Sequence, residues 1–149
     1  MDVWKPSVTV AAVIERDGKF LFVEEDIDGR RVLNQPAGHL DPGESLAEAC
    51  AREVLEETAH RFTPDSLVGV YRWHYAPKDV TFLRFCFAGR VGAAEDRPLD
   101  RPVVAVHWLT LDELKARRAM HRSPLVQKCV EDRLAGRAWP LELFSPEFQ

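Results

Sequence analysis

At 149 residues, the chain is long enough for one compact domain, residues 1–149, with an ordinary hydrophobic core. Its 46% hydrophobic and 30% charged residues exclude a disordered or low-complexity protein. A formal charge of −4, without a basic block, argues against duplex nucleic acid as a partner. The three cysteines are widely spaced, and no apolar run approaches the roughly 20 residues of a membrane span, so we expect a cytoplasmic protein.

The first part of the chain predicts β-strands. Two runs rich in Val, Ile and Phe, Ser7–Glu15 and Lys19–Glu24, flank an Asp-Gly turn, which is typical of a β-hairpin. After Arg31–Asn34, a loop containing Pro36, Gly38, Pro42 and Gly43 leads toward a helix. β-branched and aromatic residues indicate three later strands, Ser66–Tyr75, Val80–Val91 and Pro102–Leu109, of which the first two form a second hairpin through a short turn. Residues 92–101 are polar and are expected to form an exposed loop.

Three helices are expected from their start signals. Ser45 and Glu48 form a capping box before Leu46–Thr58, a run without Gly or Pro. Thr110 and Glu113 form a second box, and Ser123-Pro124 opens a helix that stops near Gly136. Together with the strands, these helices predict an α+β protein in which helices pack on a mixed sheet.

The helix Leu46–Thr58 carries the clearest chemical signal. Glu53, Glu56 and Glu57 are three and four residues apart and therefore share one face, where we expect the three carboxylates to converge and repel one another. Divalent cations such as Mg²⁺ would offset this repulsion, because they take carboxylate oxygens together with water and substrate phosphates. A solvated acidic helix face is the alternative. Apolar residues on both sides of the helix favour a cleft instead.

Three neighbouring residues have possible supporting roles. Arg52 can pair with Glu48 or Glu56 at helical spacing and orient a carboxylate, or it forms a routine surface ion pair. Glu44 precedes the helix and is too far from Glu57 to share a metal, so we expect it to bond loop amides. Gly38 can bring its backbone carbonyl close to a metal, and a simple turn glycine is an equally good explanation.

Other chemistries find little support. The histidines lack the i, i+4 spacing of a helical zinc pair, and the chain has neither a GxxxxGK[ST] loop nor a GxSxG elbow. The run Tyr71 to Tyr75 can stack on a heteroaromatic substrate, although a strand with alternate residues in the core is the preferred interpretation.

The segment from Gly38 to Glu57 resembles the box of the Nudix family, in which glycine, glutamate and arginine stand at fixed spacings. The matching positions are Gly38, Glu44, Arg52, Glu53, Val54, Glu56 and Glu57. Two positions differ, because Ala59 replaces the closing glycine and His60 replaces the aliphatic residue after it. Alanine in a left-handed cap costs about 1 kcal/mol, so we expect the helix to run on slightly.

The resemblance extends along nearly the whole chain to a branch of bacterial phosphatases of the NudJ type. It rests on four further segments, which are 34–40, 82–85, 122–126 and 139–142. Membership implies an α/β/α sandwich and Mg²⁺-dependent hydrolysis of nucleoside di- and triphosphates and thiamine-type pyrophosphates, with Mn²⁺ as a possible substitute. It implies a metal site of Glu53, Glu56, Glu57 and the Gly38 carbonyl, with Arg52 orienting them and Glu53 as base.

The partner is then a small phosphorylated molecule, and the protein a monomer or small homo-oligomer. Arg31, Trp73 and Arg84 are candidate substrate-binding residues, and Glu95 or Asp96 is a less favoured additional base in the exposed loop. One alternative is a Nudix hydrolase of other specificity that cleanses the nucleotide pool and releases pyrophosphate. Another is a non-catalytic domain that senses a nucleotide. Specificity in this fold lies in loops that one sequence does not locate.

Overall fold

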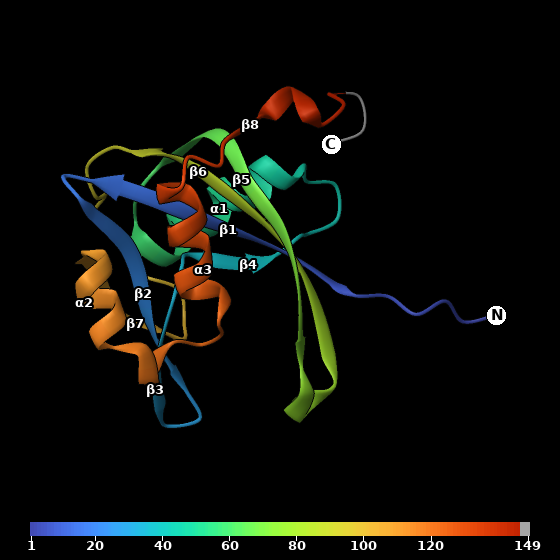
Figure 1. Ribbon diagram of the computed structural model, residues 1–149, viewed down its shortest axis with the longest axis horizontal. Coiled ribbons are helices and arrows are strands. Elements are labelled where there is room, and N and C mark those ends of the chain that lie inside the picture. Colours follow the sequence, from blue (N-terminus) through green and yellow to red (C-terminus); the bar gives the residue numbers. More distant parts are fainter. Residues whose placement is uncertain (147–149) are drawn as a thin grey trace.

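A computed structural model describes residues 1–146, so the predicted domain extends three residues beyond it (Figure 1). The described strands are β1 (Ser7–Arg16), β2 (Lys19–Ile27), β3 (Arg30–Asn34), β4 (Ala37–His39), β5 (Phe62–Tyr75), β6 (Val80–Val91), β7 (Val103–Leu109) and β8 (Trp139–Pro140). The α-helices are α1 (Leu46–Thr58), α2 (Leu111–Ala116) and α3 (Leu125–Leu134). Short 3-10 turns are η1 (Ala76–Lys78), η2 (Arg118–Met120) and η3 (Leu141–Leu143).

The strands form a mixed sheet in the order β3-β2-β1-β6-β5-β8. Strand β1 runs parallel to β6 and antiparallel to β4, while β2 also pairs with β7. The predicted first hairpin is present, but β1 and β2 pair only beside their turn, at Glu15 with Phe20 and Arg16 with Lys19. The second predicted hairpin, β5 and β6, pairs along its whole length and reaches beyond the rest of the sheet (Figure 1).

Helices cover both faces of the sheet, because alternate residues of β1 enter two separate cores. Val10, Ala12 and Ile14 pack with Ala49, Cys50 and Val54 of α1. On the other face, Ala11 and Val13 belong to the core that α2 and α3 complete, with Leu114, Val126 and Cys129 among its members. In Figure 1, α3 lies in front of the sheet and α1 behind it. The α+β fold and the α/β/α sandwich are confirmed.

Helix α1 begins and ends at sharply defined residues. The capping box is present, with the Ser45 hydroxyl accepting from the Glu48 amide and the Glu48 carboxylate accepting from the Ser45 amide, both at 3.0 Å. The expectation that Ala59 extends the helix is wrong. Ala59 adopts the left-handed conformation, with φ of 60°, and α1 ends at Thr58. Tertiary bonds offset the cost, since the Ala59 carbonyl accepts from the Glu95 amide at 2.7 Å and His60 is buried beside Trp108.

The remaining helices and strands follow the prediction with some differences. The Thr110–Glu113 capping box is confirmed, and α3 begins at Leu125, one residue later than expected, because Pro124 occupies the cap. Strand β5 begins at Phe62 instead of Ser66. Strands β4 and β8 were not predicted, since three and two residues are too short for a sequence pattern. No helix within residues 1–146 is long and apolar enough to cross a membrane.

Candidate active site

The candidate site lies where β4 meets the second half of α1. Gly38 pairs with Val10 of β1, and its Cα faces the Glu53 carboxyl group so closely that a Cβ at residue 38 would overlap that group. Glycine is therefore required by close packing. The alternative interpretation as a turn glycine is wrong, because Gly38 lies within β4. The chain thus holds the backbone of residue 38 directly against a carboxylate of the helix.

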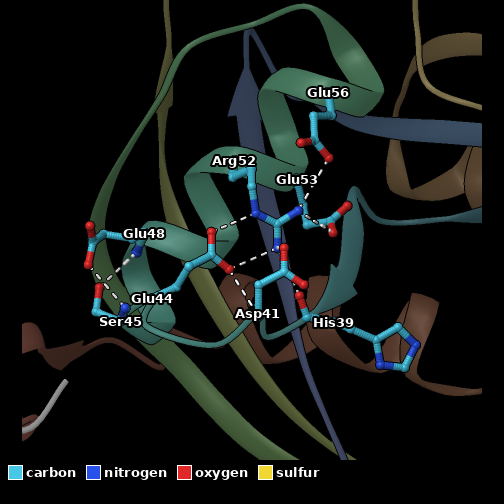
Figure 2. A network of polar contacts seen from close by, with 8 residues as sticks. All are labelled: His39, Asp41, Glu44, Ser45, Glu48, Arg52, Glu53 and Glu56. Carbon is cyan, nitrogen blue, oxygen red and sulfur yellow. Dashed lines mark hydrogen bonds and ion pairs between the residues drawn. The ribbon is translucent and has the colours of Figure 1, made fainter.

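Arg52 is the centre of an ionic network along the exposed edge of α1 (Figure 2). Its Nε and Nη2 atoms donate to the two carboxylate oxygens of Glu44, at 2.6 and 3.0 Å. Its Nη1 atom donates to Glu53 at 2.9 Å and to Glu56 at 3.3 Å, while Nη2 also donates to the His39 carbonyl at 2.9 Å. The guanidinium therefore ties the loop before α1 to two box glutamates.

The prediction for Arg52 was correct for Glu56 and wrong for Glu48, whose carboxylate is used in the capping box. Glu44 bonds the Asp41 amide at 3.0 Å, as expected for loop support, and additionally grips Arg52. That bond lowers the pKa of Glu44. The pairing was not foreseen because Glu44 lies outside the helix, where helical spacing gives no information.

Glu57 is a buried acid, and Glu53 is partly buried. Glu57 is 8% exposed and accepts a bond from the Ala37 amide at 2.9 Å. Burial raises the pKa of Glu57 to about 9, although the Ala37 amide acts in the opposite direction. Burial also raises the pKa of Glu53, against the lowering effect of Arg52. With a pKa of about 9, Glu57 would carry a proton at neutral pH unless a cation came close enough to replace it.

The three glutamates share the predicted helix face, but their carboxylates do not converge in this conformation. Within the part of the chain that the structure describes, no three acidic, His or Cys side chains stand ready to hold one ion. The reason is that Glu56 turns toward Arg52, whereas Glu53 and Glu57 line a pocket. The donor set nevertheless fits a hard divalent cation, because two carboxyl groups, one buried and one partly buried, line one cavity and can present oxygen atoms to an ion.

The pocket has a volume of about 310 Å³, and its opposite wall is formed by β5 and β6. Trp73 and Phe82 stack there with ring centroids 6.0 Å apart and planes 15° from parallel. Arg84 is buried beside them and donates to Asn34 and Gln35. Arg122, from the segment between η2 and α3, also lines the pocket and pairs with Glu25 at 3.1 Å.

Two of the three predicted substrate-binding residues, Trp73 and Arg84, therefore lie at this pocket. Arg31 does not, because it pairs with Glu24 at 3.0 Å and with Asp26 at 3.7 Å on the half-exposed surface of β3. The loop acids are also elsewhere, since Glu95 pairs with Arg61 at 2.6 Å near the end of α1 and Asp96 is exposed.

Two polar residues of the pocket, Asn34 and Arg122, were not identified from the sequence, nor was Gln35, which bonds Arg84. Asn34 and Gln35 are polar yet 7% and 1% exposed. A polar pair at the end of a strand is a recognisable signal, but only its burial distinguishes it from an ordinary turn. Arg122 comes from a segment 65 residues after Glu57 in the chain, and no local pattern predicts that contact.

Comparison with known proteins agrees with this site. The model of the NUDIX domain matches residues 4–129. Phosphatase NudJ of Shigella boydii serotype 4 is 41% identical over 143 residues, which cover 95% of this chain and 92% of that protein. Phosphatase NudJ of Escherichia coli K12 is 39% identical over 142 residues, with the same coverage.

Solved structures agree as well. A NUDIX hydrolase from Nitrosomonas europaea is 53% identical, covers 95% of this chain and 97% of its own, and superposes with a TM-score of 0.92. A MutT NUDIX hydrolase from Burkholderia pseudomallei, at 21% identity and TM-score 0.73, covers 87% of this chain and 98% of its own and shares the fold. The chain therefore belongs to the Nudix family, as a NudJ-like hydrolase of acid anhydrides in phosphorus-containing substrates.

Proposed function

We propose that this protein hydrolyses the terminal phosphoanhydride bond of nucleoside di- and triphosphates and of thiamine-type pyrophosphates, with Mg²⁺, and releases phosphate. The observation that carries the proposal is the pocket between α1 and the β5–β6 hairpin. One wall presents Glu53 and Glu57, and the other presents an aromatic stack and a buried arginine. This arrangement suits a substrate that has a phosphate chain at one end and an aromatic ring at the other.

The metal site of the proposal consists of Glu53, Glu56, Glu57 and the Gly38 carbonyl, and Mn²⁺ is a possible substitute for Mg²⁺. Bound there, a divalent ion would neutralise phosphate charge and lower the pKa of the attacking water. Glu53 and Glu57 already face the pocket, and Glu56 reaches it by releasing its 3.3 Å bond to Arg52. Arg52 retains Glu44 after that change, so it continues to orient Glu53.

Glu53 is the proposed base for the attacking water. It lies against the backbone of Gly38, and the Arg52 bond at 2.9 Å fixes one carboxylate oxygen. Glu57 is less suited to act as the base, because the Ala37 amide holds its carboxylate in place. Trp73 is proposed to stack on the aromatic ring of the substrate, because its indole lines the pocket opposite the acids.

A Mg²⁺-dependent screen tests the proposal. The purified protein is incubated with nucleoside di- and triphosphates, nucleotide sugars and thiamine pyrophosphate, and ion chromatography separates phosphate from pyrophosphate. We expect phosphate from the nucleoside di- and triphosphates and from thiamine pyrophosphate. Release of pyrophosphate alone would replace the proposal with a nucleotide-pool hydrolase, and turnover that EDTA leaves unchanged would contradict the metal requirement.

A further inference from the structure

We infer that Arg84 binds a non-bridging phosphate oxygen of the substrate, and that Asn34 and Gln35 are positioning residues that hold the guanidinium without neutralising it. The assignment of the chain to the Nudix family does not depend on the contacts among these three residues. The identification of the anion as a phosphate of the scissile chain rests on the proposed function. The presence of an anion subsite rests on the contacts of Arg84 itself.

Arg84 is a buried cation without a buried anion. Its side chain belongs to a residue that is 7% exposed, and none of the ion pairs within residues 1–146 includes it. Buried arginines are normally compensated by a carboxylate, because an uncompensated charge in the interior is costly. An anionic ligand would supply the negative charge that compensates Arg84.

The guanidinium of Arg84 donates to two neutral amides. Nη1 donates to the Gln35 side-chain oxygen at 2.9 Å, and Nη2 donates to the Asn34 side-chain oxygen at 3.0 Å. Gln35 is itself fixed, since its Nε2 atom donates to the Val126 carbonyl at 2.6 Å at the start of α3. These bonds set the plane of the guanidinium while leaving its full positive charge available.

The position of Arg84 in the pocket completes the argument. The residue lies on β6 and lines the same cavity as Glu53 and Glu57 of α1, so one cavity has an acidic wall and a basic wall. A metal-bound phosphate chain is the ligand class that matches both walls, because its metal faces carboxylates and its free oxygens face arginine. Trp73, on the neighbouring strand, lines the pocket on the side of Arg84 and remains available to a ring.

The Cys129 thiol is a further polar group close to Arg84. Cys129 is fully buried, and its hydrogen bond with Cys86 and the positive charge of Arg84 lower the pKa of the thiol. A thiolate at this position would neutralise Arg84 from within the protein. The Cys129→Ser variant removes that possibility with little change in volume, and we expect it to bind anions as the wild type does.

The test measures equilibrium binding of methylenediphosphonate, a diphosphate analogue that is not hydrolysed, by calorimetry in the presence of Mg²⁺. Asn34→Asp and Gln35→Glu replace a neutral partner of Arg84 with a carboxylate of nearly the same shape. We expect both variants to bind the probe about 10- to 100-fold more weakly, because the new carboxylate would compete with the probe for the charge-assisted bond of Arg84. Gln127→Glu makes the same chemical change on the surface of α3 and should alter binding less than about twofold.

Kinetics supply the second readout. If Asn34 and Gln35 act through Arg84 on substrate binding, the variants should raise KM more than they lower kcat. Gln35→Glu also loses the amide that bonds the Val126 carbonyl. A lower melting temperature of this variant would therefore report a loss of stability. Asn34→Asp retains that bond and gives the cleaner result.

The inference is overturned if Asn34→Asp binds methylenediphosphonate as tightly as the wild type, if the wild type does not bind it, or if Cys129→Ser binds it about tenfold more tightly. Failure of the proposed function looks different. In that case the wild type binds the probe through Arg84 but releases no phosphate from any substrate in the screen.

Discussion

The two walls of the pocket differ in how the chain builds them. The acidic wall comes from one continuous segment, Gly38 to Glu57, whose side chains are held by a helix, its capping box and the Arg52 network. The opposite wall collects Asn34, Trp73, Arg84 and Arg122 from three strands and a connecting segment. Chemistry that depends on a fixed spacing is therefore local in the sequence, whereas the contacts that select a substrate are distributed over the fold.

Loss of a box carboxylate should have the largest effect on activity. We expect Glu53→Gln and Glu57→Gln each to lower kcat at least about 100-fold with saturating Mg²⁺, because neutral amides replace metal-binding oxygens. Phosphate release measures the effect. Glu48→Gln is the matched control on the same helix, since glutamine preserves the capping box. Wild-type turnover in both Glu53→Gln and Glu57→Gln would break the assignment of the acidic wall.

The raised pKa of Glu57 gives a second prediction, for the metal-free protein. The carboxyl group has a pKa of about 9 when folded, against an ordinary value of 4.5. The unfolded state therefore releases this proton first, and stability that is fully present below pH 4.5 declines as the pH rises toward 9. The contribution is at most about 1.4 kcal/mol per pH unit.

Denaturant unfolding at several pH values, in EDTA, should show this decline for the wild type. Glu57→Gln has no group to titrate at this position, so its unfolding free energy should vary less between pH 5 and 9. Saturating Mg²⁺ should reduce the decline in the wild type if the ion binds the deprotonated carboxylate. Identical pH profiles for the wild type and Glu57→Gln would contradict the burial argument.

Gly38→Ala should separate packing from charge at the acidic wall. A Cβ at this position would overlap the Glu53 carboxyl group, so α1 or β4 must shift. Overpacking of this kind costs about 1–3 kcal/mol of unfolding free energy. We expect an activity loss of roughly 10-fold or more, because small displacements of catalytic groups are costly. Gly92→Ala, where a Cβ has open space, is the control for the loss of a glycine.

Trp73→Leu should weaken substrate binding at the opposite wall. The indole stacks on Phe82 and lines the pocket, so its loss should raise KM about 3- to 10-fold for aromatic substrates. The effect on kcat should be small, because Trp73 lies on β5, in the wall opposite the carboxylates of α1. Arg31→Ala should change KM less than about twofold, since Arg31 pairs with Glu24 on the surface. Equal effects of the two variants would contradict this division.

The difference between the walls also explains what was predictable from the sequence. The start of α1 at its capping box, the capping box of α2 and the full length of β6 follow from local rules of capping, periodicity and turn chemistry. The α/β/α arrangement came from the family resemblance. Trp73 and Arg84 were identified as candidates, but nothing local distinguished them from Arg31.

What the sequence did not reveal depends on contacts between distant segments. Glu44 reaches Arg52 because the loop before α1 folds back along the helix. Ala59 accepts a strained conformation because Glu95 and His60 hold the chain from outside the helix. Helical spacing predicted that the three carboxylates converge, and this was wrong for the present conformation, because Glu56 bonds Arg52 instead.

The central claim is that the carboxylates at the end of α1 hold the divalent ion. Equilibrium binding of Mn²⁺, measured by calorimetry without substrate, tests it independently of any choice of substrate. The claim predicts binding in the wild type and in Glu48→Gln, and at least about tenfold weaker binding in Glu53→Gln and Glu57→Gln. Equal Mn²⁺ affinity in all four proteins would contradict it.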